Sequence, residues 1–173
     1  MDFNTDHFTL FNLPRSYRID NIALDQRYRE IQTEVHPDRF AGAEDALQRR
    51  SLQWATRANE AYQTLKKPLA RAQYLLSLLD CGLDLANNHA MSADFLIEQM
   101  EWREAVAEAR ASKAQEDLEA LYQRVRQQLR NAYAQLENLL DEQHDYPQAA
   151  DQTRRLMFLE KLISEIDEAL ADE

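Results

Sequence analysis

Pro37 constrains the fold of this chain most, because it separates two long segments that both have helical apolar periodicity. A proline lacks a backbone N–H and fixes φ, and it also disfavours the α region for the residue before it, His36. The helix predicted over residues 22–35 must therefore end here, and the helix predicted over residues 44–67 must start beyond the bend. We expect His36-Pro37-Asp38 to form a rigid, exposed bend at the tip of a helical hairpin.

The rest of the chain is also predicted to be helical. Among 173 residues there are only two glycines and four prolines, and no run of alternating β-branched residues indicates a strand. With 45% hydrophobic residues, the chain can bury the core of one large domain or two small ones. The sequence therefore predicts an all-α protein.

Apolar residues three and four positions apart define the predicted buried faces. Shorter helices, near residues 6–13 and 68–79, are expected to brace the hairpin, with Asn12 in the left-handed conformation that ends the first. Periodicity is interrupted after residue 83, and three helices follow from residue 93. We predict a first domain over residues 1–82, a linker over 83–92 and a three-helix bundle over 93–173. The predicted stripes are Leu24, Tyr28, Ile31 and Val35; Leu47, Trp54, Ala58, Ala61 and Leu65; Leu118, Tyr122, Val125, Leu129, Leu136 and Leu140; and Leu156, Leu159, Ile163, Ile166 and Leu170.

The charge distribution excludes several functions. The net charge is −11, and residues 1–80 carry 11 basic and 11 acidic side chains, so the whole excess lies in the second half. This balance disfavours nucleic-acid binding.

Cys81 is the only cysteine, which excludes an intrachain disulfide and a cysteine-rich metal site. No signal peptide or long apolar run is present, so we expect a cytoplasmic protein that does not enter a membrane.

The helix that starts at residue 93 has a second apolar face. At 100° per residue, its core face spans about 60°. This face contains Phe95, Trp102, Val106 and Ala109. The almost opposite arc contains Leu96, Ile97, Met100, Glu101, Glu104 and Glu108. An apolar patch with a methionine and a rim of charge is typical of a protein-binding surface, although a bundle that wraps further could bury it. A metal cluster on these carboxylates would need a Glu-x-x-His helix, which the sequence lacks.

Phe158 is a second aromatic residue that the core does not require. Its direction lies about 120° from the buried stripe of the last helix, so we expect its ring to be at least partly exposed, with Leu162 one turn further along. We predict that Phe158 adjoins the patch that begins at Leu96.

Six segments together resemble a known family. DHFTLFNL (6–13), HPDRF (36–40) and ANEAYQTL (58–65) resemble a J-domain. PLARAQYLL (68–76), FLIEQMEWRE (95–104) and RLMFLEK (155–161) resemble HscB-type co-chaperones of iron-sulfur cluster biogenesis over essentially the whole chain. The resemblance implies a J-domain and a C-terminal three-helix bundle in an L-shaped molecule. Arg39 and Asn12 stand where J-domains often have Lys and Gly.

The resemblance also implies partners and sites. One partner is the DnaK-class chaperone HscA, whose ATP hydrolysis the His-Pro-Asp bend would stimulate; its implied binding residues are His36, Pro37, Asp38, Tyr28, Arg29 and Arg39. The other is the scaffold protein IscU; its implied binding residues are Leu96, Ile97, Met100, Glu101, Glu104, Glu108 and Phe158.

Two other functions remain open from the residues alone. In the first, His36 and Asp38 form a catalytic dyad, but no nucleophile elbow, glycine-rich phosphate loop or metal cluster accompanies them. In the second, the chain is a J-domain co-chaperone for a different client. We therefore expect a co-chaperone that is not itself an enzyme, with no catalytic residue, cofactor or metal.

Overall fold

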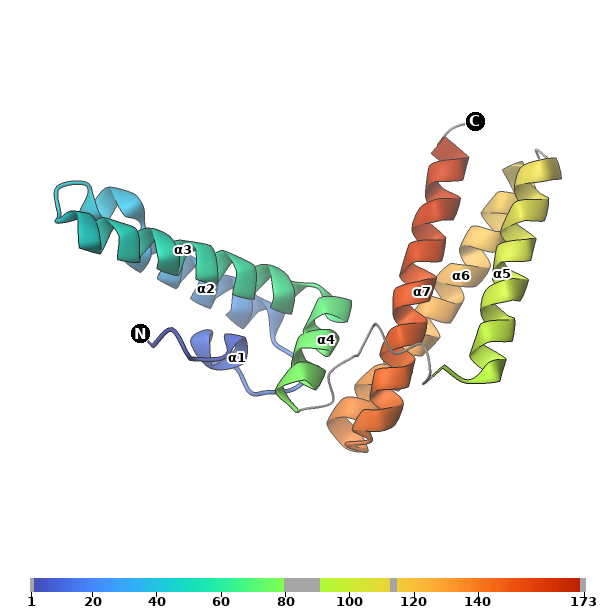
Figure 1. The fold of residues 1–173 in the computed structure, drawn as a ribbon, viewed down its shortest axis with the longest axis horizontal. Helices are drawn as coiled ribbons and strands as arrows, with labels where there is room; N and C mark the ends of the chain where they lie inside the picture. Colours follow the sequence, from blue (N-terminus) through green and yellow to red (C-terminus); the bar gives the residue numbers. More distant parts are fainter. Residues whose placement is uncertain (1, 80–90, 113–114, 172–173) are drawn as a thin grey trace. The chain divides into compact units, whose positions relative to one another are not determined.

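The computed structural model describes residues 2–79, 91–112 and 115–171. Every regular element in these ranges is helical, which confirms the predicted all-α class (Figure 1). The chain divides into two compact units, residues 1–75 and 76–173, and the division falls within α4 (Pro68–Leu78). Residues 83–90 of the predicted linker, and Cys81, lie outside the described residues.

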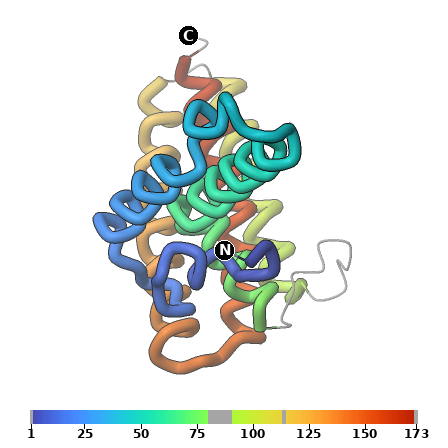
Figure 2. Tube along the Cα trace, turned by 90° about the vertical axis from the view of Figure 1, so that its left-hand side faces the viewer, coloured from blue at the N-terminus to red at the C-terminus, as the bar shows by residue number. Residues whose placement is uncertain are grey.

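The first unit is built on a helical hairpin. Its long helices are α2 (Asn21–Val35) and α3 (Asp45–Lys66), which lie side by side in Figure 1 and Figure 2. Between them, a 3₁₀ turn, η1 (Pro37–Phe40), packs against α3. The predicted bounds of both helices are correct to within one residue. The bend therefore stands at the tip of the hairpin, as Pro37 requires.

Side chains cap the elements that brace this hairpin. Asp6 accepts hydrogen bonds from the backbone and hydroxyl of Thr9 at the start of α1 (His7–Leu10), and Asn12 follows with φ of 55°, which confirms its left-handed conformation. At the far end of the hairpin, the buried Arg71 of α4 donates to the Leu65 carbonyl at 2.7 Å.

The buried face of the hairpin differs from the predicted stripe at one end. The residues buried on it are Leu24, Ile31, Val35, Ser51, Trp54, Ala58, Ala61 and Leu65, while Tyr28 is half-buried. Leu47 is 47% exposed, so its predicted burial is wrong. Ser51, one turn later on the same side of α3, is buried instead. The physical reason is that α2 ends at Val35, which packs near Ser51, and does not extend as far as Leu47.

The second unit is a bundle of α5 (Ala93–Ser112), α6 (Gln115–Glu137) and α7 (Tyr146–Ala171). Contacts between α6 and α7 are the most extensive, and α5 joins both along a narrower face. Most predicted core positions are confirmed, but Phe95 and Leu170, near the ends of the bundle helices, are only half-buried. In addition, Leu121 and Leu162 are buried where Tyr122 and Ile163 were predicted, and those two are half-buried. These two errors are each one position, because neighbouring residues on a helix both border the same face.

The chain leaves α6 through a π-helical turn, Asn138–Glu142. In this turn, the Gln143 N–H donates to the carbonyl of Asn138, five residues earlier, at 2.9 Å. Leu140 is buried, and His144 follows with φ of 53°. Leu140, within this π-helical turn, is therefore the last core residue before α7 begins.

The burial of His7 makes the stability of the first unit depend on pH. Its ring stacks on Tyr74 with centroids 4.1 Å apart, and no hydrogen bond reaches its buried Nδ1 atom. Burial, and then the positive charge of Arg57, lower the pKa of His7 below 6.5. The unfolded chain therefore takes up a proton near pH 6.5 that the folded unit excludes, so stability falls as the pH drops below that value.

We expect His7→Phe to weaken this pH dependence, because phenylalanine can keep the stack and has no proton to gain. Urea unfolding at pH 7 and pH 5 measures it, and the wild type should lose more unfolding free energy between the two. Asp6 does not interfere, because its burial is outweighed by hydrogen bonds from Arg15 and Thr9, which lower its pKa from 3.8 to about 2, and both values lie below pH 5. Parallel pH profiles for the two proteins would contradict the prediction.

Candidate docking surfaces

The His-Pro-Asp bend projects its polar groups into solvent. The His36 and Asp38 side chains are mostly exposed. The Asp38 N–H donates to His36 Nδ1 at 3.2 Å, so the imidazole caps the 3₁₀ turn that follows it. The Asp38 carboxylate stands 3.6 Å from the same nitrogen. The bend therefore presents an imidazole and a carboxylate side by side on the surface of the first unit.

The predicted basic side chains near the bend are placed differently from one another. Arg39 reaches back and donates to the Thr33 carbonyl at 3.2 Å, which satisfies part of the open end of α2. Arg29 is exposed on α2, and its Nε atom donates to the carbonyl of Asp25 at 3.3 Å. Arg29 therefore presents charge to solvent, and Arg39 also stabilises the bend.

Tyr28 is held by α3, which the sequence did not predict. Its ring stacks on Tyr62 with centroids 4.1 Å apart, and its hydroxyl donates to Asn59 at 3.1 Å. Tyr62 in turn donates to Asp25, which also accepts from Lys66 at 2.7 Å. The Lys66 and Tyr62 hydrogen bonds hold the pKa of Asp25 below its usual value. Tyr28 thus forms part of a connection between the hairpin helices as well as a surface beside Arg29.

The predicted patch on α5 is exposed. Leu96 is 48%, Ile97 53% and Met100 71% exposed, and Glu101, Glu104 and Glu108 are exposed around them. Trp102, Val106 and Ala109, on the other side of the helix, are buried. The bundle therefore leaves this apolar face uncovered, and we call Leu96, Ile97 and Met100 the α5 patch. In the described ranges, no three His, Cys, Asp or Glu side chains are grouped so that they could hold a metal ion.

Phe158 contacts two residues of α5, Phe95 and Arg103. It is half-buried, its ring meets Phe95 edge-on with centroids 6.1 Å apart, and the Arg103 guanidinium stands over it at 5.5 Å. Arg103 and Leu96 point within about 20° of each other on α5, which places Phe158 next to the patch. Leu162 is buried, so the prediction of a second exposed residue one turn further along α7 is wrong.

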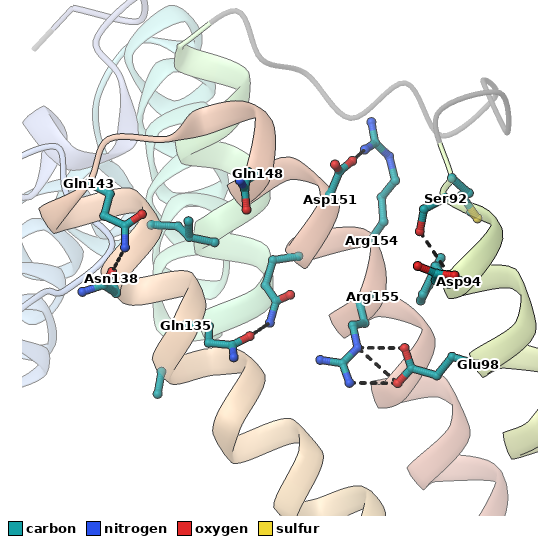
Figure 3. A pocket seen from close by; sticks show the side chains of 15 residues that line it. Ser92, Asp94, Glu98, Gln135, Asn138, Gln143, Gln148, Asp151, Arg154 and Arg155 are labelled. Atoms are coloured by element: carbon teal, nitrogen blue, oxygen red, sulfur yellow. Dashed lines mark hydrogen bonds and ion pairs between the residues drawn. The ribbon is translucent and has the colours of Figure 1, made fainter.

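A cavity of about 780 Å³ opens on a different side of α5 (Figure 3). It lies where the start of α5, the end of α6 and the start of α7 meet. Figure 3 shows Arg155 facing Glu98, to which it donates at 2.8 to 3.2 Å, and Arg154 facing Asp151 at 2.6 Å. Both arginines are therefore neutralised by carboxylates. Glu98 points almost opposite to Leu96 and Met100 on the helix, so the cavity is separate from the α5 patch.

Comparisons with known proteins agree with this architecture. Residues 91–167 match the family model described as the HSCB C-terminal oligomerisation domain. A co-chaperone HscB homologue of Azoarcus sp. is 54% identical over 170 residues, 98% of this chain and 96% of the relative. One from Burkholderia vietnamiensis is 49% identical over 92% of this chain and 91% of the relative.

Solved structures give the same result. HscB of Vibrio cholerae matches with a TM-score of 0.82 and 37% identity, over 95% of this chain and 96% of that one. Human HscB matches with a TM-score of 0.89 and 29% identity, over 96% and 83% of the two chains. None of the helices in the described residues is long and apolar enough to cross a membrane.

The helical hairpin with a His-Pro-Asp bend at its tip, together with relatives that are named co-chaperones, places this protein in the class of J-domain co-chaperones. Within that class, the chain belongs to the HscB family.

The bend allows a direct spectroscopic prediction. Because His36 Nδ1 accepts a hydrogen bond from a backbone N–H, we expect the neutral ring to carry its proton on Nε2. A long-range proton–nitrogen correlation spectrum measures this tautomer. His144 is the internal control, because its Nδ1 lies 3.0 Å from the Leu140 carbonyl, which only accepts, so we expect its proton on Nδ1. Finding the Nδ1–H form at His36 would contradict this geometry.

Proposed function

We propose that this protein is an adaptor that binds the iron-sulfur scaffold IscU, delivers it to the DnaK-class chaperone HscA, and stimulates the ATP hydrolysis of that chaperone. In this proposal the reaction takes place on the chaperone, and the adaptor contributes binding surfaces alone. Membership of the HscB family supports the proposal, since its relatives carry the name co-chaperone.

The observation that carries the proposal is the presence of two exposed, chemically different surfaces on separate compact units. One unit presents the bend and the exposed Arg29, a polar surface with a basic side chain. The other presents the α5 patch, with Phe158 at its edge and carboxylates around it. A large apolar residue in such a patch gains free energy when a partner covers it, and surrounding charges select the partner.

We assign the chaperone to the J-domain, residues 1–82, and the scaffold to the bundle, residues 93–173. The chaperone surface comprises His36, Pro37, Asp38, Tyr28, Arg29 and Arg39. The scaffold surface comprises Leu96, Ile97, Met100, Glu101, Glu104, Glu108 and Phe158. Linking the two surfaces in one chain raises the local concentration of the scaffold at the chaperone when hydrolysis is triggered.

We expect His36→Gln to abolish stimulation of the chaperone ATPase and to leave scaffold binding intact. The substitution removes the imidazole at the exposed bend, whereas the α5 patch is on the other unit. Steady-state phosphate release measures stimulation, and calorimetry with IscU serves as the control in the same protein preparation. Full stimulation by the variant would rule out docking through the bend.

We expect simultaneous Leu96→Ala and Phe158→Ala to weaken binding of IscU by about 2 to 4 kcal/mol if both residues are hot spots. Leu47→Ala is a matched control, because Leu47 is 47% exposed and Leu96 48%, but Leu47 belongs to the other unit. Isothermal calorimetry should show an unchanged affinity for the control. If the double variant binds as tightly as the wild type, a different surface must hold the scaffold.

A further inference from the structure

The residues of the bend do not supply all the hydrogen-bond donors that the last carbonyls of α2 need. The last carbonyls of a helix have no partner within the helix, and Pro37 supplies no N–H for the turn that follows α2. At this end of α2 the Thr33 carbonyl accepts from Arg39. The Val35 carbonyl, directly before His36, accepts from a residue of a different helix.

That residue is Ser51 of α3. Its hydroxyl donates to the Val35 carbonyl at 2.5 Å, and the side chain is only 5% exposed. Ser51 holds a position on the buried stripe of α3 that apolar side chains occupy further along, at Trp54 and Ala58. An apolar residue at position 51 would leave the buried end of α2 one hydrogen bond short.

Gln48 supports the other end of the same loop. It lies one turn before Ser51 on α3, and its side-chain amide donates to the Ala41 carbonyl at 3.3 Å and to the Ala43 carbonyl at 3.0 Å. Residues three apart on a helix share a face. Two neighbouring polar side chains of α3 therefore hold the chain where it enters the bend and where it leaves it.

We propose that Ser51 is a positioning residue for the His-Pro-Asp bend, assisted by Gln48. The Ser51 hydrogen bond fixes the carbonyl one residue before His36, and thereby the direction in which the imidazole and the Asp38 carboxylate point. Ser51 is buried, so it acts through the bend and needs no contact with a partner. This inference rests on the proposed function, because the positioned bend is the proposed chaperone-docking site.

The test is the stimulation of the HscA ATPase by the full chain as a function of its concentration. Ser51→Ala removes the hydroxyl and should raise the half-saturating concentration by about three- to tenfold, the range expected for one lost hydrogen bond. Ser51→Thr keeps a hydroxyl and should restore stimulation. Gln48→Ala, at an exposed position, should raise the half-saturating concentration by a smaller factor.

A general loss of stability must be separated from a loss of positioning. Phe8→Leu is the control, because it thins the core of the same unit at α1 and leaves Ser51 and Gln48 unchanged. Thermal unfolding ranks Ser51→Ala and Phe8→Leu by stability. The proposal predicts that, when compared well below both unfolding midpoints, only Ser51→Ala needs a higher concentration for stimulation.

A second readout keeps the test independent of the chaperone. The Asp38 amide signal and the His36 nitrogen signals should shift in Ser51→Ala and stay at their wild-type positions in Phe8→Leu. If the wild type stimulates and Ser51→Ala matches it, the positioning role is overturned and the proposed function stands. If the wild type does not stimulate, the proposed function fails, and unchanged His36 and Asp38 signals in Ser51→Ala would overturn the positioning role as well.

Discussion

The hydrogen-bond deficit at the end of α2 is the constraint on which the first unit depends. Pro37 ends the helix but contributes no donor, so the terminal carbonyls must be met from elsewhere. Arg39 from the turn and Ser51 from α3 meet two of them. Because one donor belongs to α3, the packing of the two long helices also holds the chain directly before the bend. The geometry of the exposed bend is therefore coupled to the packing of the hairpin.

In the bundle, the packing of α5 leaves one of its apolar faces uncovered. The α6 and α7 helices form the most extensive contact of the unit, while α5 adds a narrow face with Trp102, Val106 and Ala109. A helix that packs along so narrow a face leaves much of its circumference in solvent. The α5 patch can therefore stay exposed without loss of core packing, and Phe158 extends it because α7 packs beside α5.

Local rules predicted much of this structure. Proline chemistry placed the bend, periodicity placed the long helices, and projection of α5 separated Trp102 from Leu96. Sequence reasoning missed Ser51, because apolar periodicity does not identify buried polar residues. Its burial depends on a hydrogen bond to the carbonyl of a residue on another helix. Sequence reasoning also assigned Leu47 to the core, since the apolar period of α3 continues past the position that packs against the end of α2. The Tyr28–Tyr62 stack joins residues 34 positions apart, for which the sequence offers no spacing signal.

The π-helical turn at Asn138–Glu142 has a consequence for chain length. Such a turn holds one residue more than an α-helical turn, and the extra residue can be removed without rotating the helix before it. Here the turn stands between α6 and the loop that leads to α7, so losing or gaining a residue would be absorbed before the first buried position of α7. Because the buried Leu140 lies in this turn, a change of length that follows Leu140 would be taken up before α7 begins, and the register between α6 and α7 would be preserved.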